Sequence, residues 1–116
     1  MIDREHHMGE FLRLFNAREF FDAHDALEEF WQEYGGGDRT FYQGLIQVAV
    51  ALEHAQRGNQ KGARGVLNSA RHRLQPYLPH YEGFDLTRLL QQASRCIEEG
   101  EEPPYLPDPG ADDEEA

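Results

Sequence analysis

The 116-residue sequence contains one cysteine, Cys96, and no apolar run approaching the roughly 20 residues that a membrane-spanning helix needs. A lone cysteine excludes an internal disulfide and is typical of a reducing compartment. The segment from Met1 to Met8 lacks the apolar core of a signal peptide. These absences argue against a disulfide-stapled secreted scaffold and an integral membrane protein. We expect a cytoplasmic protein with no membrane partner.

Positive charge is scarce, because 11 basic residues stand against 22 acidic ones and give a formal net charge of −11. The imbalance is local. Nine acidic residues and no basic residue follow from Glu98 onward, which leaves 13 acids against 11 bases in the rest of the chain. Residues 101–116 are rich in proline and acid and poor in apolar side chains, so they are predicted to form a disordered acidic tail. The alternative is a tail that folds back on a basic patch, anchored by Tyr105 and Leu106.

No segment shows the alternation of apolar and polar residues that predicts a strand, and no internal repeat is present. Stop and start signals instead divide the chain up to Gly100 into helices. Asn16 is predicted to begin one of them with a capping box completed by Glu19, and Asp38, Asn59 and Asp85 are predicted to cap three more. The predicted helices cover a short stretch before residue 15 and then about 17–34, 39–57, 60–75 and 86–100.

The segment 44–52 is apolar almost all round, so it is predicted to be the central and most buried helix. The two later helices are amphipathic, with apolar residues at i, i+3, i+4 and i+7. Together these patterns predict an all-α protein. Residues 1–100 are expected to form one domain, a compact bundle of about five helices, and residues 101–116 are expected to be the disordered tail.

His24, Glu28 and Trp31 form an H-x-x-x-E-x-x-W pattern in the predicted helix that ends near residue 34. Residues three and four apart on a helix are neighbours, with Cβ atoms about 5–6 Å apart. An imidazole and a carboxylate one turn apart can therefore share a proton or a metal ion. Because aromatic residues flank this stripe, the motif is expected to lie close to the packed face of its helix.

Three glycines at positions 35–37 are expected to turn the chain into an antiparallel helical hairpin. The register of that hairpin places Gln43, Gly44 and Gln47 level with the motif, and Gly44 would let the two helices approach closely. His54 falls about 9 Å beyond His24 along the helix axis. As a third ligand for a metal ion at His24 and Glu28 it would have to reach over that distance, and its side chain could instead contact Asn16.

Three interpretations of the motif are open. The first is a structural hydrogen-bond network in which His24 and Glu28 pair with Gln43 and Gln47 across the hairpin. The second is a site for a divalent metal such as zinc, held by His24 and Glu28 with His54 as third ligand. The third is metal-free acid–base catalysis, in which Glu28 raises the basicity of His24. No substrate or reaction follows from the pattern.

No acidic residue occurs between Glu53 and Glu82, and the predicted fourth helix carries a polar stripe with four positive charges. The stripe would suit a phosphate, a nucleic acid backbone or the acidic tail, and the alternative is a solvated helix face. So few positive charges in an acidic molecule argue against a nucleic acid partner. The stripe consists of Arg57, Lys61, Arg64, Asn68 and Arg71.

Three separated blocks resemble the bacterial and archaeal family catalogued as domain of unknown function 309. They are the segment 15–31 with the motif, the segment 42–49, and the segment 54–63, and the resemblance covers about residues 10–95. It implies an all-helical fold with an unassigned biochemical role. It also implies metal binding by the motif, which carries over onto His24, Glu28 and Trp31. Asp25 departs from the family pattern, in which glutamate is more frequent.

Two functional hypotheses follow. The first is a small cytosolic helical protein with a polar pocket centred on His24 and Glu28 that binds a divalent metal, with Asn16, Trp31, Gln43 and Gln47 around it. The second is a non-catalytic interaction module in which the motif is a structural network. Self-association into a homo-oligomer is compatible with both, and no protein partner is identified.

Overall fold

The computed structural model describes residues 3–107. Within this range the chain forms five α-helices, one 3-10 turn and one short hairpin of two strands, so the predicted all-α bundle of about five helices is confirmed. In chain order the elements are α1 (Arg4–Asn16), α2 (Phe20–Glu33), α3 (Arg39–Gln56), α4 (Gln60–Leu74), η1 (Gln75–Tyr77), β1 (His80–Tyr81), β2 (Phe84–Asp85) and α5 (Leu86–Glu99).

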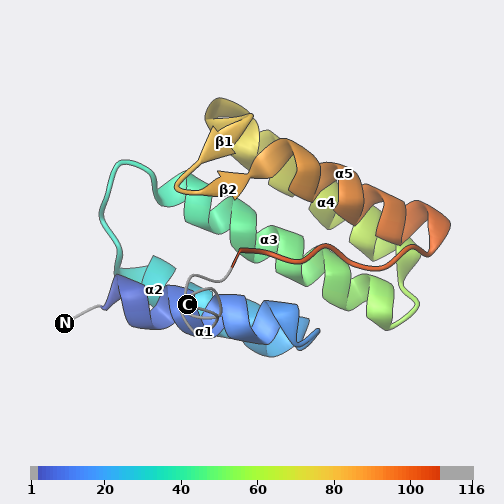
Figure 1. The fold of residues 1–116 in the computed structure, drawn as a ribbon, viewed down its shortest axis with the longest axis horizontal. Coiled ribbons are helices and arrows are strands. Elements are labelled where there is room, and N and C mark those ends of the chain that lie inside the picture. The colour runs from blue at the N-terminus through green and yellow to red at the C-terminus, as the bar shows by residue number, and fades with distance from the viewer. Residues whose placement is uncertain (1–2, 108–116) are drawn as a thin grey trace, which may run out of the picture.

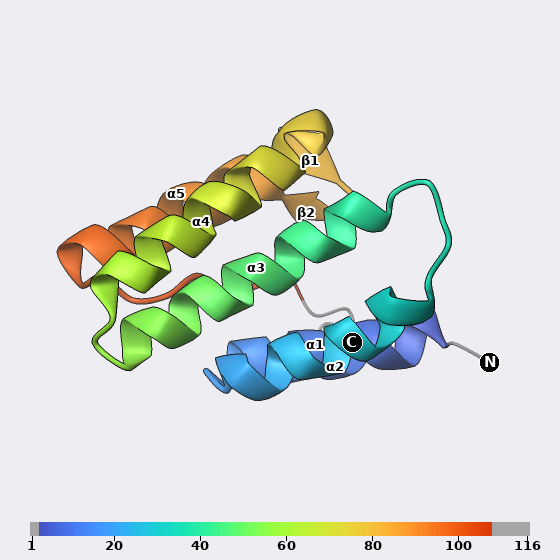
Figure 2. The same ribbon diagram turned by 180° about the vertical axis from the view of Figure 1, so that it is seen from behind.

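Helix α3 is the centre of the molecule, as its apolar sequence predicted. It lies between the α1–α2 pair and the α4–α5 pair, and both views show it in this middle position (Figures 1 and 2). A helix that is apolar on most of its circumference has to be covered on both sides, because exposed apolar surface costs free energy. Its buried residues are Phe41, Tyr42, Gly44, Leu45, Ile46, Val48, Ala49, Ala51 and Leu52.

Two of the four predicted helix caps form. The side chain of Asn59 caps α4 by accepting a hydrogen bond from the Gly62 backbone N–H at 3.0 Å. The side chain of Asp85 caps α5 by accepting one from the Arg88 backbone N–H at 3.0 Å. Helix α5 ends at Gly100, whose φ of 71° is the left-handed conformation that glycine adopts without strain.

The predicted cap at Asn16 is wrong. Asn16 is the last residue of α1, and α2 begins at Phe20 after a turn in which Arg18 has a φ of 67°. The side chain of Asn16 is engaged elsewhere, as described below. Asp38 also fails to cap α3, because its carboxylate accepts hydrogen bonds from the hydroxyls of Tyr34 and Tyr81 at 2.6 and 2.9 Å.

The hairpin between α4 and α5 was not predicted. Strands β1 and β2 are antiparallel, with Tyr81 opposite Phe84, and Glu82 and Gly83 between them have φ values of 50° and 82°. Positive φ at both central residues is the signature of a type I′ turn. Strands of two residues are too short to show alternation of apolar and polar residues, so the sequence pattern carries no signal for them.

Gly44 permits a close helix approach, but to a different helix from the one predicted. A Cβ atom at Gly44 would lie 2.6 Å from the Leu74 side chain of α4. The expectation that Gly44 brings α3 close to α2 is therefore wrong, because the tight contact belongs to the α3–α4 interface.

The predicted boundary of the disordered tail is also wrong. Residues 101–107, which we call the C-terminal strap, run back from the end of α5 across α3, as the red segment of Figure 1 shows. Pro104 is buried and Leu106 is only 6% exposed, so two apolar anchors offset the entropy of ordering this segment. The remainder of the predicted tail, residues 108–116, lies outside the described residues.

Candidate functional site

His24 and Glu28 lie one turn apart on α2 and form a pair. The His24 Nε2 atom is 3.3 Å from a Glu28 carboxylate oxygen, and both side chains are partly buried. The ring of Phe21, which is 55% exposed, meets the imidazole edge to face at a centroid distance of 5.1 Å. The helical stripe that the sequence predicted therefore exists, and the imidazole is held between an aromatic ring and a carboxylate.

The second nitrogen of His24 is isolated. Its Nδ1 atom is buried and has no hydrogen-bond partner among the described residues. A buried N–H without an acceptor costs about 1–3 kcal/mol, whereas a nitrogen lone pair beside apolar groups costs less. In a neutral imidazole the arrangement therefore favours the tautomer in which Nε2 carries the proton, and this nitrogen faces the Glu28 carboxylate at 3.3 Å.

A metal ion at this pair would need partners that the described residues do not supply. Coordination through Nε2 would move the ring proton to Nδ1, where it has no acceptor, and metal-bound histidines usually donate that second N–H to a carboxylate, carbonyl or water. The predicted third ligand, His54, is not grouped with His24 and Glu28, and its Nδ1 atom contacts the Asn59 amide at 3.2 Å. Within residues 3–107 no cluster of three or more histidine, cysteine or acidic side chains is arranged to hold a metal.

The other residues predicted around the motif have different partners. Gln47 accepts a hydrogen bond from Arg73 of α4 at 3.1 Å, and Gln43 makes no side-chain hydrogen bond within the described range. Trp31 donates its indole N–H to the backbone carbonyl of Arg39 at 3.2 Å, and the guanidinium of Arg39 lies 3.8 Å from the indole centroid. Trp31 therefore joins the end of α2 to the start of α3, and the predicted cross-helix network with Gln43 and Gln47 does not form.

The basic stripe on α4 is partly neutralised. Arg64 forms a two-bond ion pair with Glu98 of α5, with both nitrogen–oxygen distances at 2.6 Å. Arg57 pairs with Glu53 of α3 at 2.8 Å. The C-terminal strap makes no hydrogen bond to this stripe within the described residues. The predicted docking of the acidic tail on α4 is therefore not seen for residues 101–107, and the rest of that tail lies outside the described residues.

Asn16 instead holds the C-terminal strap. Its side-chain amide donates to the backbone carbonyl of Leu106 at 2.8 Å, and its side-chain oxygen accepts from the backbone N–H of the same residue at 2.8 Å. One planar amide thus satisfies both main-chain groups of a residue 90 positions away. This pairing resembles one rung of a β-ladder, made by a side chain.

Arg18 makes the other set of strap contacts. Its guanidinium donates to the carbonyl of Pro104 at 2.8 Å and to that of Pro103, and it contacts the Glu102 carboxylate at 3.3 Å. The same group stacks on the Tyr105 ring at 3.7 Å from the centroid. Hydrogen bonds from a charged donor are stronger than neutral ones, so this clamp combines charge, hydrogen bonding and cation–π attraction.

The backbone of Arg18 is strained. A φ of 67° in a residue with a Cβ atom is uncommon and is maintained only where surrounding contacts enforce it. One such contact comes from α3, where the Gln56 side chain donates to the Arg18 carbonyl at 2.9 Å. Arg18 was not predicted as a functional residue, because no residue pattern marks a non-glycine residue that adopts this conformation.

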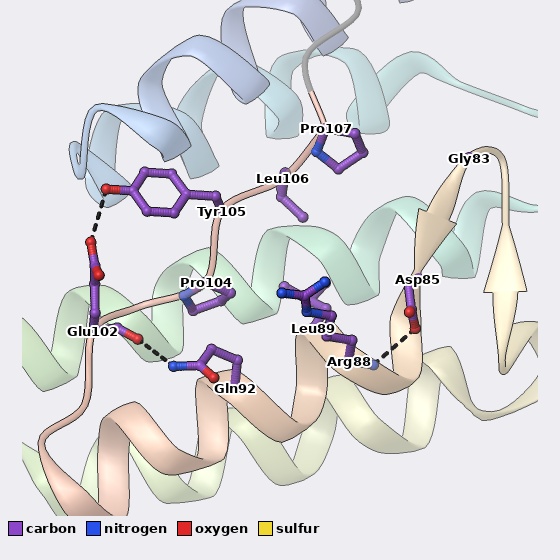
Figure 3. Close-up of a pocket in the computed structure, with 10 residues that line it drawn as sticks. All are labelled: Gly83, Asp85, Arg88, Leu89, Gln92, Glu102, Pro104, Tyr105, Leu106 and Pro107. Atoms are coloured by element: carbon purple, nitrogen blue, oxygen red, sulfur yellow. Dashed lines mark hydrogen bonds between the residues drawn. The ribbon is translucent and has the colours of Figure 1, made fainter.

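A groove of about 550 Å³ lies between the strap and α5 (Figure 3). The strap is tied to α5 across it by a hydrogen bond from Gln92 to the Glu102 carbonyl at 2.7 Å. Tyr105 turns its hydroxyl back to the Glu102 carboxylate at 2.9 Å. Asp85 and Arg88 at the start of α5 line the far end of the groove, so the groove has apolar and charged walls.

A smaller cavity of about 160 Å³ lies between α1, α3 and the hairpin. Tyr42 is one wall, and its hydroxyl is buried without a hydrogen-bond partner among the described residues, so burial raises the pKa of Tyr42 to about 12. The ion pair of Arg4 and Glu82, 2.8 Å apart, also lines this cavity. Nearby, burial opposes ionisation of Asp38, but the hydrogen bonds from two tyrosine hydroxyls outweigh it and hold its pKa below the ordinary value.

Comparison with known proteins gives a family match and two relatives. The model of the family described as "Domain of unknown function (DUF309)" matches residues 8–66, a range that contains every residue predicted for the site. The uncharacterized protein YpuF of Bacillus subtilis (strain 168) is 35% identical over 86 residues, which are 72% of this chain and 49% of that protein. An uncharacterized protein of Aquifex aeolicus (strain VF5) is 34% identical over 56 residues, 47% of this chain and 17% of that protein.

The chain thus spans about half the length of the Bacillus relative and a smaller part of the Aquifex one. Within the described range, no helix combines the length and hydrophobicity needed to cross a membrane.

Proposed function

The chain belongs to the DUF309 family, and from that premise we propose that it is a non-catalytic interaction module in which the H-x-x-x-E-x-x-W motif is structural. In this proposal His24 and Glu28 form an ion-pair contact within one turn of α2, and Trp31 joins α2 to α3 through its hydrogen bond to the Arg39 carbonyl. The module acts by holding a polypeptide partner on a rigid helical frame.

The buried Nδ1 atom of His24 carries the first part of the proposal. It has no acceptor among the described residues, so coordination of a metal through Nε2, which moves the ring proton to Nδ1, would leave that proton without a partner. A general base would need Nε2 free of its proton and directed at a substrate. In this structure Nε2 instead faces the Glu28 carboxylate of its own helix at 3.3 Å.

The lengths of the relatives support the second part. Similar segments lie within a protein about twice as long as the matched region and within one about six times as long. A unit that occurs within chains of different lengths is typical of a module that folds by itself and works beside other partners.

The competing function is divalent metal binding, for example of zinc, by His24 and Glu28. Its support is the 3.3 Å separation of two ligand atoms on one helical turn. It would need a further ligand from outside the described residues, and an acceptor for the His24 Nδ1 proton.

Metal content and stability of His24→Ala and Glu28→Ala separate these functions. We expect untagged protein purified without chelator to contain far less than one metal ion per chain by elemental mass spectrometry. We expect His24→Ala to lower the free energy of unfolding by about 1–3 kcal/mol, because it strands the partly buried Glu28. The matched control is His72→Ala on the exposed face of α4, which should change stability by less than about 0.5 kcal/mol. Near-stoichiometric metal in the parent that disappears in both motif variants would refute the structural interpretation.

A further inference from the structure

Resting on the proposed interaction role, we infer that the surface beneath the C-terminal strap is a binding site for an extended, proline-containing segment of a partner protein. Residues 102–107 are then the resident intramolecular ligand of this site. The receiving side chains are Asn16 at the end of α1, Arg18 in the α1–α2 turn, and Gln92 on α5.

The receiving groups recognise backbone. The Asn16 side chain forms hydrogen bonds with both the N–H and the carbonyl of Leu106. Arg18 donates hydrogen bonds to the carbonyls of Pro103 and Pro104. Gln92 donates a hydrogen bond to the carbonyl of Glu102. None of these bonds depends on the ligand being continuous with α5. An extended segment of another chain that presents the same main-chain groups satisfies the same donors and acceptor.

The chemistry of Arg18 explains the preference for proline. A guanidinium only donates hydrogen bonds, and two consecutive prolines offer it carbonyls while carrying no N–H of their own that would be left without a partner. Proline also holds the segment extended before binding, which lowers the entropy lost on association. A Pro-Pro dipeptide is therefore the main-chain partner that Arg18 suits best.

Three side chains set the rest of the ligand pattern. Leu106 is 6% exposed and enters the core, so this position requires an aliphatic residue. Tyr105 stacks on the Arg18 guanidinium at 3.7 Å, which selects an aromatic ring. Glu102 faces the same guanidinium at 3.3 Å, which favours an acid. The expected ligand reads acid-Pro-Pro-aromatic-aliphatic.

The site is prepared before the ligand arrives. Arg18 is held in a left-handed backbone conformation, and Gln56 of α3 supports it through its carbonyl. Residues in strained conformations cluster at binding sites, where the strain positions a side chain for its ligand. Because Gln56 belongs to the central helix, the clamp is fixed to the rigid part of the bundle.

The strap also leaves space that another ligand could use. A groove of about 550 Å³ remains between the strap and α5 when residues 102–107 are in place. Asn16, Arg18 and Gln56 lie within the residues that match the family model, and the strap lies outside that match. Two of the three receiving side chains, Asn16 and Arg18, therefore lie in the part that matches the family, whereas Gln92 and the strap lie outside it.

The strap should compete strongly with a ligand from another chain. A tethered segment acts at an effective concentration in the millimolar range, so the parent chain should bind a separate peptide at least about tenfold more weakly than a variant with a loosened strap. Leu106→Ala loosens the strap by removing its buried anchor.

The test is the binding of a fluorescent peptide with the sequence of residues 101–107 to full-length variants, measured by anisotropy. We expect saturable binding to Leu106→Ala, weaker binding to the parent, and a loss of about tenfold or more when Arg18→Ala is added to Leu106→Ala. A peptide with alanine at the Leu106 position is the matched ligand control and should not bind. No saturable binding to a folded Leu106→Ala chain, or binding indifferent to Arg18→Ala, would overturn the inference.

If Leu106→Ala does not fold, Tyr105→Ala replaces it, because Tyr105 is 61% exposed and its loss removes only the stacking on Arg18 and the hydroxyl hydrogen bond to Glu102. Light scattering on the parent adds a further outcome. A dimer that Arg18→Ala abolishes would identify the partner as a second copy exchanging straps and would support the site. If the peptide does not bind, this inference fails but the structural role proposed for His24 and Glu28 is unaffected. If a metal is found at that pair, the structural role fails but the strap site is unaffected. The two failures are therefore distinguishable.

Discussion

Replacing Leu106 with alanine should lower the free energy of unfolding by about 2–4 kcal/mol. The side chain is 6% exposed and belongs to the hydrophobic core, although it lies in a segment without regular secondary structure. Removing it leaves a cavity where the strap meets the bundle, and the strap has few other apolar contacts to compensate. Urea denaturation followed by circular dichroism measures the change.

The neighbouring residue is the matched control for this prediction. Tyr105 is 61% exposed and contributes mainly through its stacking on Arg18, so Tyr105→Ala should cost less than about 1 kcal/mol. A strap that merely rests on the surface would give small and equal effects for the two substitutions. That result would indicate that residues 101–107 belong to the disordered tail that their composition predicts.

Gly44→Ala should destabilise the protein by about 1–3 kcal/mol. An added Cβ atom would lie 2.6 Å from the branched end of Leu74, closer than two carbon atoms can approach. Leu74 is itself fully buried, so it can move only by disturbing the α3–α4 interface. Thermal and urea denaturation of the two proteins measure the loss.

Gly65→Ala on α4 is the control, because an added Cβ atom there meets nothing within 4 Å. Helix propensity alone should then stabilise the protein by about 0.5–1 kcal/mol. Opposite signs for the two substitutions would locate the close helix contact at Gly44. If Gly44→Ala stabilised the protein as much as Gly65→Ala, the α3–α4 contact would be looser than described.

Local signals in the sequence predicted the local parts of this fold. Asn59 and Asp85 cap their helices, because a cap is decided by a side chain and a backbone N–H three residues apart. The apolar circumference of α3 predicted its central place, because burial of such a helix does not depend on which partners cover it.

Long-range contacts were not predictable in the same way. Asn16 has the residue type and the spacing to Glu19 of a helix cap, yet its amide is used on Leu106, 90 positions away. A tertiary contact overrides the local helix-capping propensity of a residue when it satisfies more hydrogen-bonding groups than the cap would. Arg18 carried no signal, since its role follows from a backbone conformation that its residue type disfavours.

The H-x-x-x-E-x-x-W motif shows that the spacing of residues alone does not identify the chemistry of a site. One helical turn brings His24 and Glu28 together as predicted, but the same spacing serves a metal, a catalytic pair or a structural bond. The burial of the second imidazole nitrogen favours the last of these. The sequence does not contain that information, because it depends on which side chains pack behind the ring.

The most direct test of the central claim, that the α1–α2 turn holds the strap by its main chain, is hydrogen exchange at the Leu106 amide. The Leu106 N–H donates to the Asn16 side chain at 2.8 Å, whereas the Tyr105 N–H donates no hydrogen bond within the described range. We expect exchange at Leu106 to be roughly 100-fold slower than in an unstructured peptide and to lose this protection in Asn16→Ala. Exchange of the Leu106 amide at the unstructured rate in the parent protein would contradict the account.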